Sequence, residues 1–108
     1  MKLEPIAGTD AKRVTLRPEG ARRVGLETVP VRRADGRKVV PYGAVLYMSD
    51  GRAFVYTSPR PLTYVRAPIE VEDVEGDRAV LARGPPVGTL VVAKGAAEVY
   101  GSEFEVDH

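Results

Sequence analysis

The chain has 108 residues, of which 44% are hydrophobic and 29% charged, and this combination indicates one globular domain rather than a disordered segment. Sixteen basic residues nearly balance fifteen acidic ones, and the resulting net charge of +1 argues against a protein built to coat nucleic acid. The absence of cysteine excludes a disulfide scaffold, a thiolate nucleophile and a cysteine zinc site.

The N-terminal third predicts short elements separated by glycine and proline. Residues 1–12 have no clear hydrophobic period and are expected to form a flexible arm. Val14-Thr15-Leu16 predicts a short strand, after which Pro18 opens a helix of at most two turns and Gly25 caps it. The chain then returns to extended structure in "LETVPVRR", where Pro30 indicates a sheet edge or a bulge.

Three acidic residues followed by glycine predict tight hairpin turns, at Asp35-Gly36, Asp50-Gly51 and Glu75-Gly76. Glycine adopts the positive φ values that such turns require. Between the first two turns, "KVVPYGAVLYM" predicts a strand that is broken near its Pro-Tyr-Gly sequence. After the second turn, "RAFVYT" predicts a strand with Phe54 and Tyr56 on the same face.

The clearest alternation of apolar and polar residues runs from Tyr64 to Glu72 and predicts a strand with one buried and one wet face. The buried face is expected to hold Val65, Ala67, Ile69 and Val71, and the wet face Tyr64, Arg66, Pro68, Glu70 and Glu72. Because proline cannot donate to a strand ladder, Pro68 predicts an edge strand.

The C-terminal part predicts two more strands, "RAVLA" and "TLVVA", joined by the rigid loop "RGPPVG". "KGAAEVYG" is expected to form a helical turn that ends at Gly101, and residues 102–108 an acidic tail. The period of two and the frequent turns predict an all-β fold, a small antiparallel β-barrel or sandwich with one or two short helical turns, over residues 13–101. The predicted core consists of Val45, Phe54, Val65, Ile69, Val71, Leu81, Leu90 and Val92.

No set of residues predicts catalysis, a cofactor or a metal centre. His108 is the only histidine and the last residue, so no Ser-His, Cys-His or histidine-rich arrangement can form. The segment "GPPVGTLVVAKG" lacks the spacing of a phosphate loop. The acidic turn from Glu72 to Asp77 is expected to be a solvated surface, with a weak cation site as the alternative, and the tail acids Glu103, Glu105 and Asp107 are treated in the same way.

Aromatic and basic residues alternate around Tyr56, Tyr64 and Arg66. This pattern fits the rim of a core, a protein contact anchored by tyrosine and arginine, or a stacking platform for single-stranded nucleic acid. The near-zero net charge makes the nucleic-acid alternative the weakest of the three.

Two blocks of the chain resemble a known family. "RVTLRPEGARRVGLETVPV" is similar to a strand, short helix and strand of periplasmic adaptor proteins, the membrane fusion proteins of efflux transporters. "VVPYGAVLYMSDGRAFVYT" and the following "TYVRAPIEVEDVEGDRAVLARGPPVGTLVVAKGAAEVYG" resemble the rest of their membrane-proximal β-domain. Only about a dozen residues around "RRADGRK" separate the blocks, so the chain resembles a shortened, stand-alone form without the lipoyl and hairpin domains.

The resemblance implies a non-enzymatic, extracytoplasmic protein-interaction module in the cell envelope of a bacterium, possessing a protein partner such as a membrane transporter. It also implies an export signal, and an anchor if one exists, in a segment outside this chain. The predicted contact surface holds Tyr64, Arg66, Glu70 and Glu72. A small-ligand or cation-binding β-domain is the second hypothesis, and a nucleic-acid-binding β-barrel the third.

Overall fold

The computed structural model describes residues 1–104. In chain order its elements are β1 (Lys2–Pro5), β2 (Lys12–Thr15), α1 (Pro18–Arg23), β3 (Glu27–Pro30), β4 (Arg32–Ala34), β5 (Arg37–Pro41), the 3-10 turn η1 (Tyr42–Ala44), β6 (Leu46–Tyr47), β7 (Ala53–Arg60), β8 (Thr63–Glu75), β9 (Arg78–Arg83), β10 (Leu90–Lys94) and α2 (Ala96–Phe104). The predicted all-β class is confirmed, because antiparallel strands make up most of the domain and the helices are short.

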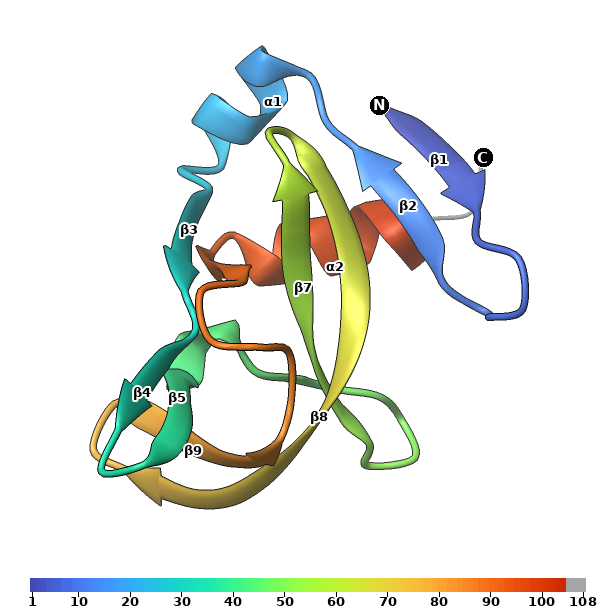
Figure 1. Ribbon diagram of the computed structural model, residues 1–108. Coiled ribbons are helices and arrows are strands. Elements are labelled where there is room, and N and C mark those ends of the chain that lie inside the picture. Colours follow the sequence, from blue (N-terminus) through green and yellow to red (C-terminus); the bar gives the residue numbers. More distant parts are fainter. Residues whose placement is uncertain (105–108) are drawn as a thin grey trace.

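The strands form one sheet that curls into a half-barrel, with the order β3-β10-β7-β8-β9-β5-β4 (Figure 1). Strands β3 and β4, at the two ends of this order, are separated in the sequence by Val31 alone. Val31 exchanges backbone hydrogen bonds with the loop before β10, accepting from Gly88 and donating to Thr89, both at 2.8 Å. The chain therefore changes its pairing partner from β10 to β5 at one buried residue.

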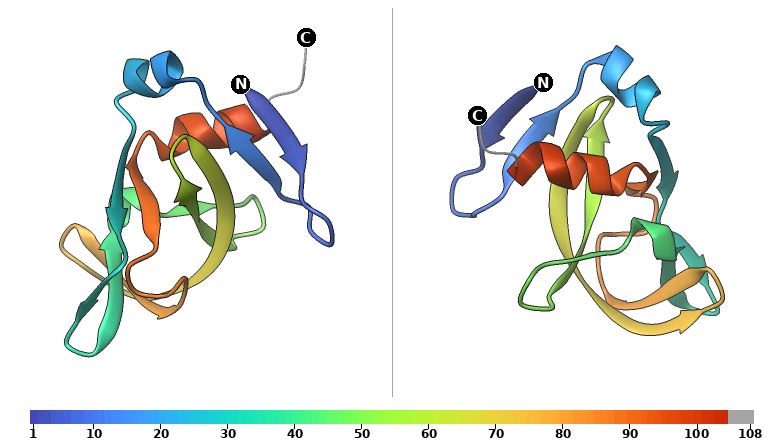
Figure 2. Two further views of the ribbon diagram at one scale, coloured as in Figure 1. Left: turned by 45° about the horizontal axis from the view of Figure 1, so that its top comes forward. Right: turned by 180° about the vertical axis from the view of Figure 1, so that it is seen from behind.

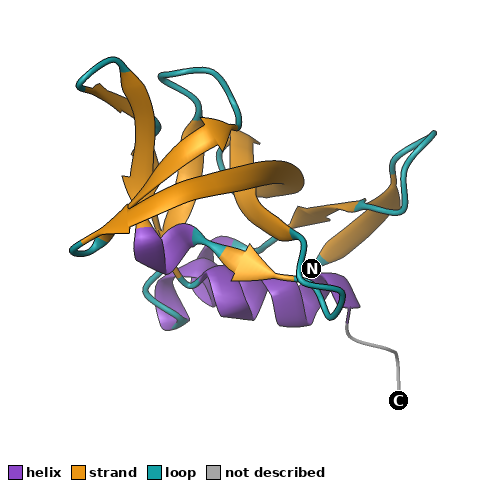
Figure 3. Ribbon diagram, turned by 90° about the horizontal axis from the view of Figure 1, so that it is seen from below, coloured by secondary structure: helices purple, strands orange, loops and turns teal. Residues whose placement is uncertain are grey.

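Strand β7 is buried on both faces and separates two hydrophobic clusters. Val55 faces the inside of the curled sheet, whereas Phe54 and Tyr56 face α2. Strand β10 divides in the same way, with Val91 in the first cluster and Val92 in the second. Helix α2 lies along one side of the sheet, as Figures 2 and 3 show, and closes the second cluster. The fold therefore has a sheet interior and a helix-covered outer face.

The predicted hairpin turns are confirmed. Asp35 and Gly36 join β4 to β5 with φ values of 52° and 77°, the paired positive angles of a tight two-residue hairpin. Gly51 precedes β7 with φ of 89°, and Gly76 joins β8 to β9 with φ of 64°. The acidic-Gly pairs are sufficient to predict the turns, because the main requirement of each turn is the positive φ that glycine adopts readily.

The N-terminal prediction is wrong in part. Residues Lys2–Pro5 do not form a flexible arm but pair antiparallel with β2 along its whole length, from Lys2 opposite Thr15 to Pro5 opposite Lys12. Leu3 packs against the second cluster. Leu3 therefore anchors β1 to the domain. The sequence did not predict this strand, because four residues are too few for an alternating pattern to be recognised.

The C-terminal prediction is wrong in part: the predicted helix forms, but it is longer than expected. Helix α2 does not end at Gly101 but continues to Phe104, and residues 102–104 belong to it instead of to an acidic tail. Ala96, Val99 and Glu103 are all buried, and their spacing of three and then four residues places them on one helical face. Glu103 obscures this helical period in the sequence, because a carboxylate is seldom buried in a core.

Most of the predicted core is buried, namely Val45, Phe54, Ile69, Leu81 and Val92. Val65 and Val71 are only half-buried. Leu90 is 42% exposed, because it is the first residue of β10 and lines a surface hollow rather than the helix-covered cluster. Within residues 1–104, no helix has the length and hydrophobicity needed to cross a membrane.

Gly95, which links β10 to α2, packs closely against Leu26, the residue before β3. Its φ is 87°, and an added Cβ would lie 3.3 Å from the Cα of Leu26. We expect Gly95→Ala to lower the free energy of unfolding by about 2–4 kcal/mol, since the backbone angle and the contact both oppose it. Urea denaturation measures the loss.

Gly76→Ala is the matched control for that substitution. Gly76 also has a positive φ, but a Cβ there would meet no atom within 4 Å. Its loss should therefore be about 1–2 kcal/mol, from the backbone angle alone. Equal losses of unfolding free energy for the two variants would show that the close contact of Gly95 with Leu26 does not affect stability.

Candidate functional site

The four residues of the predicted contact surface do not share one exposed face. Tyr64 is only 3% exposed and belongs to the second hydrophobic cluster. The side chain of Arg66 is 10% exposed. Glu70 and Glu72 remain exposed and form ion pairs, Glu70 with Arg83 at 3.2 Å and Glu72 with Arg37. The expectation of a wet face that includes Tyr64 and Arg66 is therefore wrong.

The same burial removes the basis of the nucleic-acid alternative. A stacking platform needs exposed aromatic faces. Tyr56 is completely buried, and Tyr64 nearly so. The residues that alternate in the sequence as aromatic and basic thus face α2 rather than a ligand in solution.

The acidic turn lacks the arrangement of a cation site. Glu72 pairs with Arg37, and Glu75 accepts a hydrogen bond from Arg78 at 3.1 Å. Asp73 accepts from the adjacent backbone N–H of Val74. No group of three or more acidic or histidine side chains within residues 1–104 is placed to hold a metal ion. His108, Glu105 and Asp107 lie outside the described residues.

The most distinctive polar feature of the structure is a buried cluster centred on Glu103 of α2, whose side chain is 1% exposed. Its carboxylate accepts hydrogen bonds from the Tyr56 hydroxyl at 2.6 Å and from Arg66 Nε at 2.9 Å to each oxygen. The backbone N–H of Lys12, at the start of β2, donates to the same carboxylate at 2.9 Å. Helix α2 is thereby bonded to strands β7, β8 and β2.

The guanidinium of Arg66 is enclosed by further contacts. Its Nη2 donates to the carbonyl of Asp10 at 3.1 Å, and its Nη1 lies 3.8 Å from the sulfur of Met48. The guanidinium carbon lies 4.8 Å from the ring centre of Phe104 and 5.9 Å from that of Phe54. These contacts give the buried cation acceptors and aromatic faces in place of water.

Burial raises the pKa of Tyr56 well above its ordinary value of 10.0, and the hydrogen bond to Glu103 raises it further. The phenol thus keeps its proton and acts only as a donor to the carboxylate. The four hollows beside Val29, Pro18, Ser58 and Tyr47 have none of Tyr56, Arg66 and Glu103 in their linings. The donors and acceptors of the cluster are matched to one another, so the cluster acts as a structural latch between α2 and the sheet.

A second feature, an exposed groove beside β6, is better placed for contact with another molecule. The groove has a volume of about 620 Å³ and is lined by Tyr47, Gly51, Arg52, Ala53, Pro68, Ile69, Glu70 and Val71. Tyr47 is 50% exposed and adjoins Tyr42, which is 41% exposed. The neighbouring Tyr42 side chain raises the pKa of Tyr47. Sequence reasoning did not single out this pair, because η1 interrupts the strand period.

The groove lies where β8 loses one of its neighbours. The pairing of β7 with β8 stops at Ala53 opposite Ile69, whereas β8 continues to Glu75 beside β9 alone. Among residues 1–104, no strand covers the other edge of β8 beyond Ile69. Of the four predicted contact residues, Glu70 lines the groove and Glu72 lies further along this open edge.

No family model, curated protein or solved structure matches this chain. The resemblance to adaptor domains therefore rests on the sequence blocks alone.

Removal of the Glu103 side chain would leave three buried donors without their acceptor. We expect Glu103→Ala to lower the free energy of unfolding by about 3–5 kcal/mol, the usual cost of breaking a buried charged pair from one side. Glu98→Ala, at an exposed position of the same helix, should cost less than about 1 kcal/mol. Urea denaturation compares the two, and equal losses would contradict the latch.

The raised pKa of Tyr56 also predicts a loss of stability at high pH. The folded state keeps the phenol protonated above pH 10, whereas the unfolded chain releases the proton near its ordinary pKa of 10.0. The unfolded state is therefore increasingly favoured as the pH rises above about 10. Denaturation curves between pH 9 and 11 should be less steeply pH-dependent for Tyr56→Phe than for the native chain; identical slopes would rule out this contribution.

Proposed function

We propose that this domain is a non-enzymatic protein-interaction module, similar to the membrane-proximal domain of efflux adaptors, that acts outside the cytoplasm and contacts a membrane transporter. The single observation that supports it best is the groove beside Tyr42 and Tyr47, next to the open edge of β8. Tyrosine is among the residues most enriched at protein interfaces, because it buries a large rigid area and keeps a polar tip.

The groove favours an extended segment of the partner as its occupant. Backbone groups on the open edge of β8 can pair with such a segment, and the floor formed by Ala53, Pro68 and Ile69 can receive an apolar side chain. The exposed carboxylates of Glu70, Glu72 and Asp73 favour a segment with basic residues, because the existing surface ion pairs of the first two contribute little and can be exchanged.

The proposal is tested with a photo-crosslinking amino acid at position 47 in cells that produce the protein. Because Tyr47 is half exposed, the replacement should leave the fold intact. We expect ultraviolet light to join the domain to one transporter subunit, and the double charge reversal Glu70→Lys and Glu72→Lys to weaken this adduct at least tenfold.

Val24, the residue after the end of α1, is the matched control position because it is 37% exposed. Figure 1 shows α1 at the end of the molecule away from the turn that precedes β7. An adduct of equal strength from position 24, or none from position 47, would remove the groove as the contact surface.

The location outside the cytoplasm is tested separately. The chain has no cysteine, so Ser49→Cys introduces a single thiol. We expect this thiol to react with a membrane-impermeant maleimide in intact cells if the domain is extracytoplasmic.

A further inference from the structure

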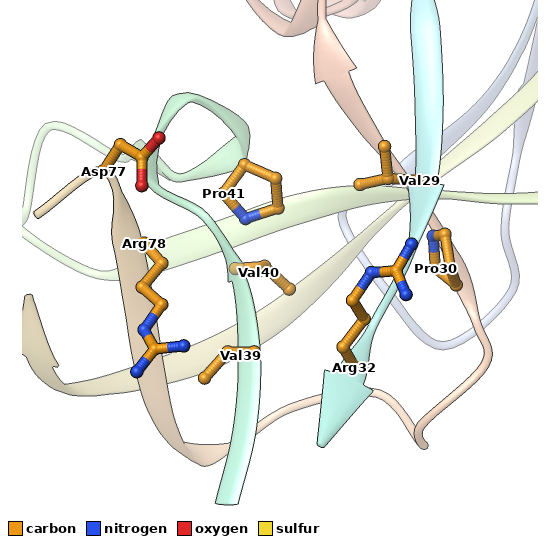
Figure 4. Close-up of a pocket in the computed structure, with 8 residues that line it drawn as sticks. All are labelled: Val29, Pro30, Arg32, Val39, Val40, Pro41, Asp77 and Arg78. Atoms are coloured by element: carbon orange, nitrogen blue, oxygen red, sulfur yellow. The ribbon is translucent and has the colours of Figure 1, made fainter. Parts of the chain in front are cut away.

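A separate cavity of about 260 Å³ lies between β3–β4 on one side and β5 on the other (Figure 4). It is lined by Val29, Pro30, Arg32, Val39, Val40, Pro41, Asp77 and Arg78. The tyrosine groove shares no lining residue with it. The cavity thus forms a second concave surface with its own lining, although its Pro41 directly precedes Tyr42 in the sequence.

The cavity arises because the chain changes pairing partner at Val31. The pairing of β4 with β5 ends at Arg32 opposite Val39, and Pro30 already pairs with Leu90 of β10. Val40 and Pro41 consequently extend beyond the reach of β4. Neither Pro30 nor Pro41 has a backbone N–H, so these two residues cannot donate hydrogen bonds across the gap. The gap between β3 and β5 is therefore built into the sequence.

The lining combines an apolar floor with an available cation. Val29, Val40 and the two prolines supply the apolar surface. The side chain of Arg32 makes no hydrogen bond or ion pair with any other described residue, and Figure 4 shows it reaching along the gap toward Pro30. Arg78 and Asp77 lie on the opposite side, where Arg78 is already paired with Glu75. One free guanidinium thus borders an apolar hollow.

We propose that this cavity binds a small amphipathic carboxylate. The Arg32 guanidinium holds the carboxylate through its planar pair of N–H donors, and the apolar body of the ligand lies against Val29, Val40 and the prolines. The volume is below the roughly 300–1,000 Å³ of sites for drug-sized ligands, so the ligand is a compact branched or aromatic monocarboxylate. An extended peptide fits less well, because the two prolines cannot donate to it.

The test is a titration of the ¹⁵N-labelled domain with phenylacetate, followed by NMR. We expect saturable shifts of the backbone signals of Val29, Arg32, Val40 and Asp77, with a dissociation constant of about 1 mM or lower for so small a ligand. Phenylacetamide, which has the same ring without the charge, should bind at least tenfold more weakly. Inorganic phosphate, which has the charge without the ring, should also bind at least tenfold more weakly than phenylacetate.

Two variants make the assignment specific. Arg32→Gln should weaken phenylacetate binding at least tenfold, whereas Arg33→Gln, at the next residue, whose guanidinium donates to the carbonyl of Gly36, should bind as the native chain does. The proposal is overturned if no saturable shift appears up to about 10 mM, if either control ligand binds as well as phenylacetate, or if the Arg32 variant retains full affinity. Photo-crosslinking from position 47 should be unchanged in Arg32→Gln, so the two sites fail or succeed separately.

Discussion

The pairing of Glu103 with Arg66 and Tyr56 is the interaction on which the arrangement of the rest depends. It bonds the last turn of α2 to β7 and β8, and through the backbone of Lys12 it also bonds β2. Transfer of a carboxylate and a guanidinium from water into a core is costly, and this cost is offset only when every donor and acceptor is matched. No buried side-chain nitrogen or oxygen in the described residues lacks a hydrogen-bond partner. The cluster therefore fixes the position of α2 more specifically than apolar contacts alone would.

The position of α2 in turn decides which surfaces are left for binding. With α2 over Phe54, Tyr56 and Tyr64, the outer face of β7 and β8 becomes a second core. The exposed hollows are consequently displaced to the places where strand pairing ends, at the open edge of β8 and at the gap beside Val31. Both proposed sites thus follow from where the backbone ladder stops, and neither needs a catalytic side chain.

The parts of the fold that the sequence predicted are those governed by local chemistry. Glycine at positions 36, 51 and 76 is enough to specify the turns, and the strands between them follow from their period of two. The prediction failed where a distant element changes the meaning of the pattern. Arg66 alternates like a solvated residue, but its partner Glu103 lies 37 residues away, on a helix that was predicted to end at Gly101. Tyr64 was misplaced for the same reason, whereas the exposure of Glu70 and Glu72 needed no distant partner.

The bond between the Lys12 backbone and Glu103 spans 91 residues of a 108-residue chain. A contact of such separation cannot form until α2 has been synthesised, and topologies rich in such contacts fold slowly. The hairpins can form first, since their contacts are local, but the apolar outer face of β7 then stays uncovered until α2 packs against it. During synthesis this exposed apolar face can associate with other chains until α2 packs against it.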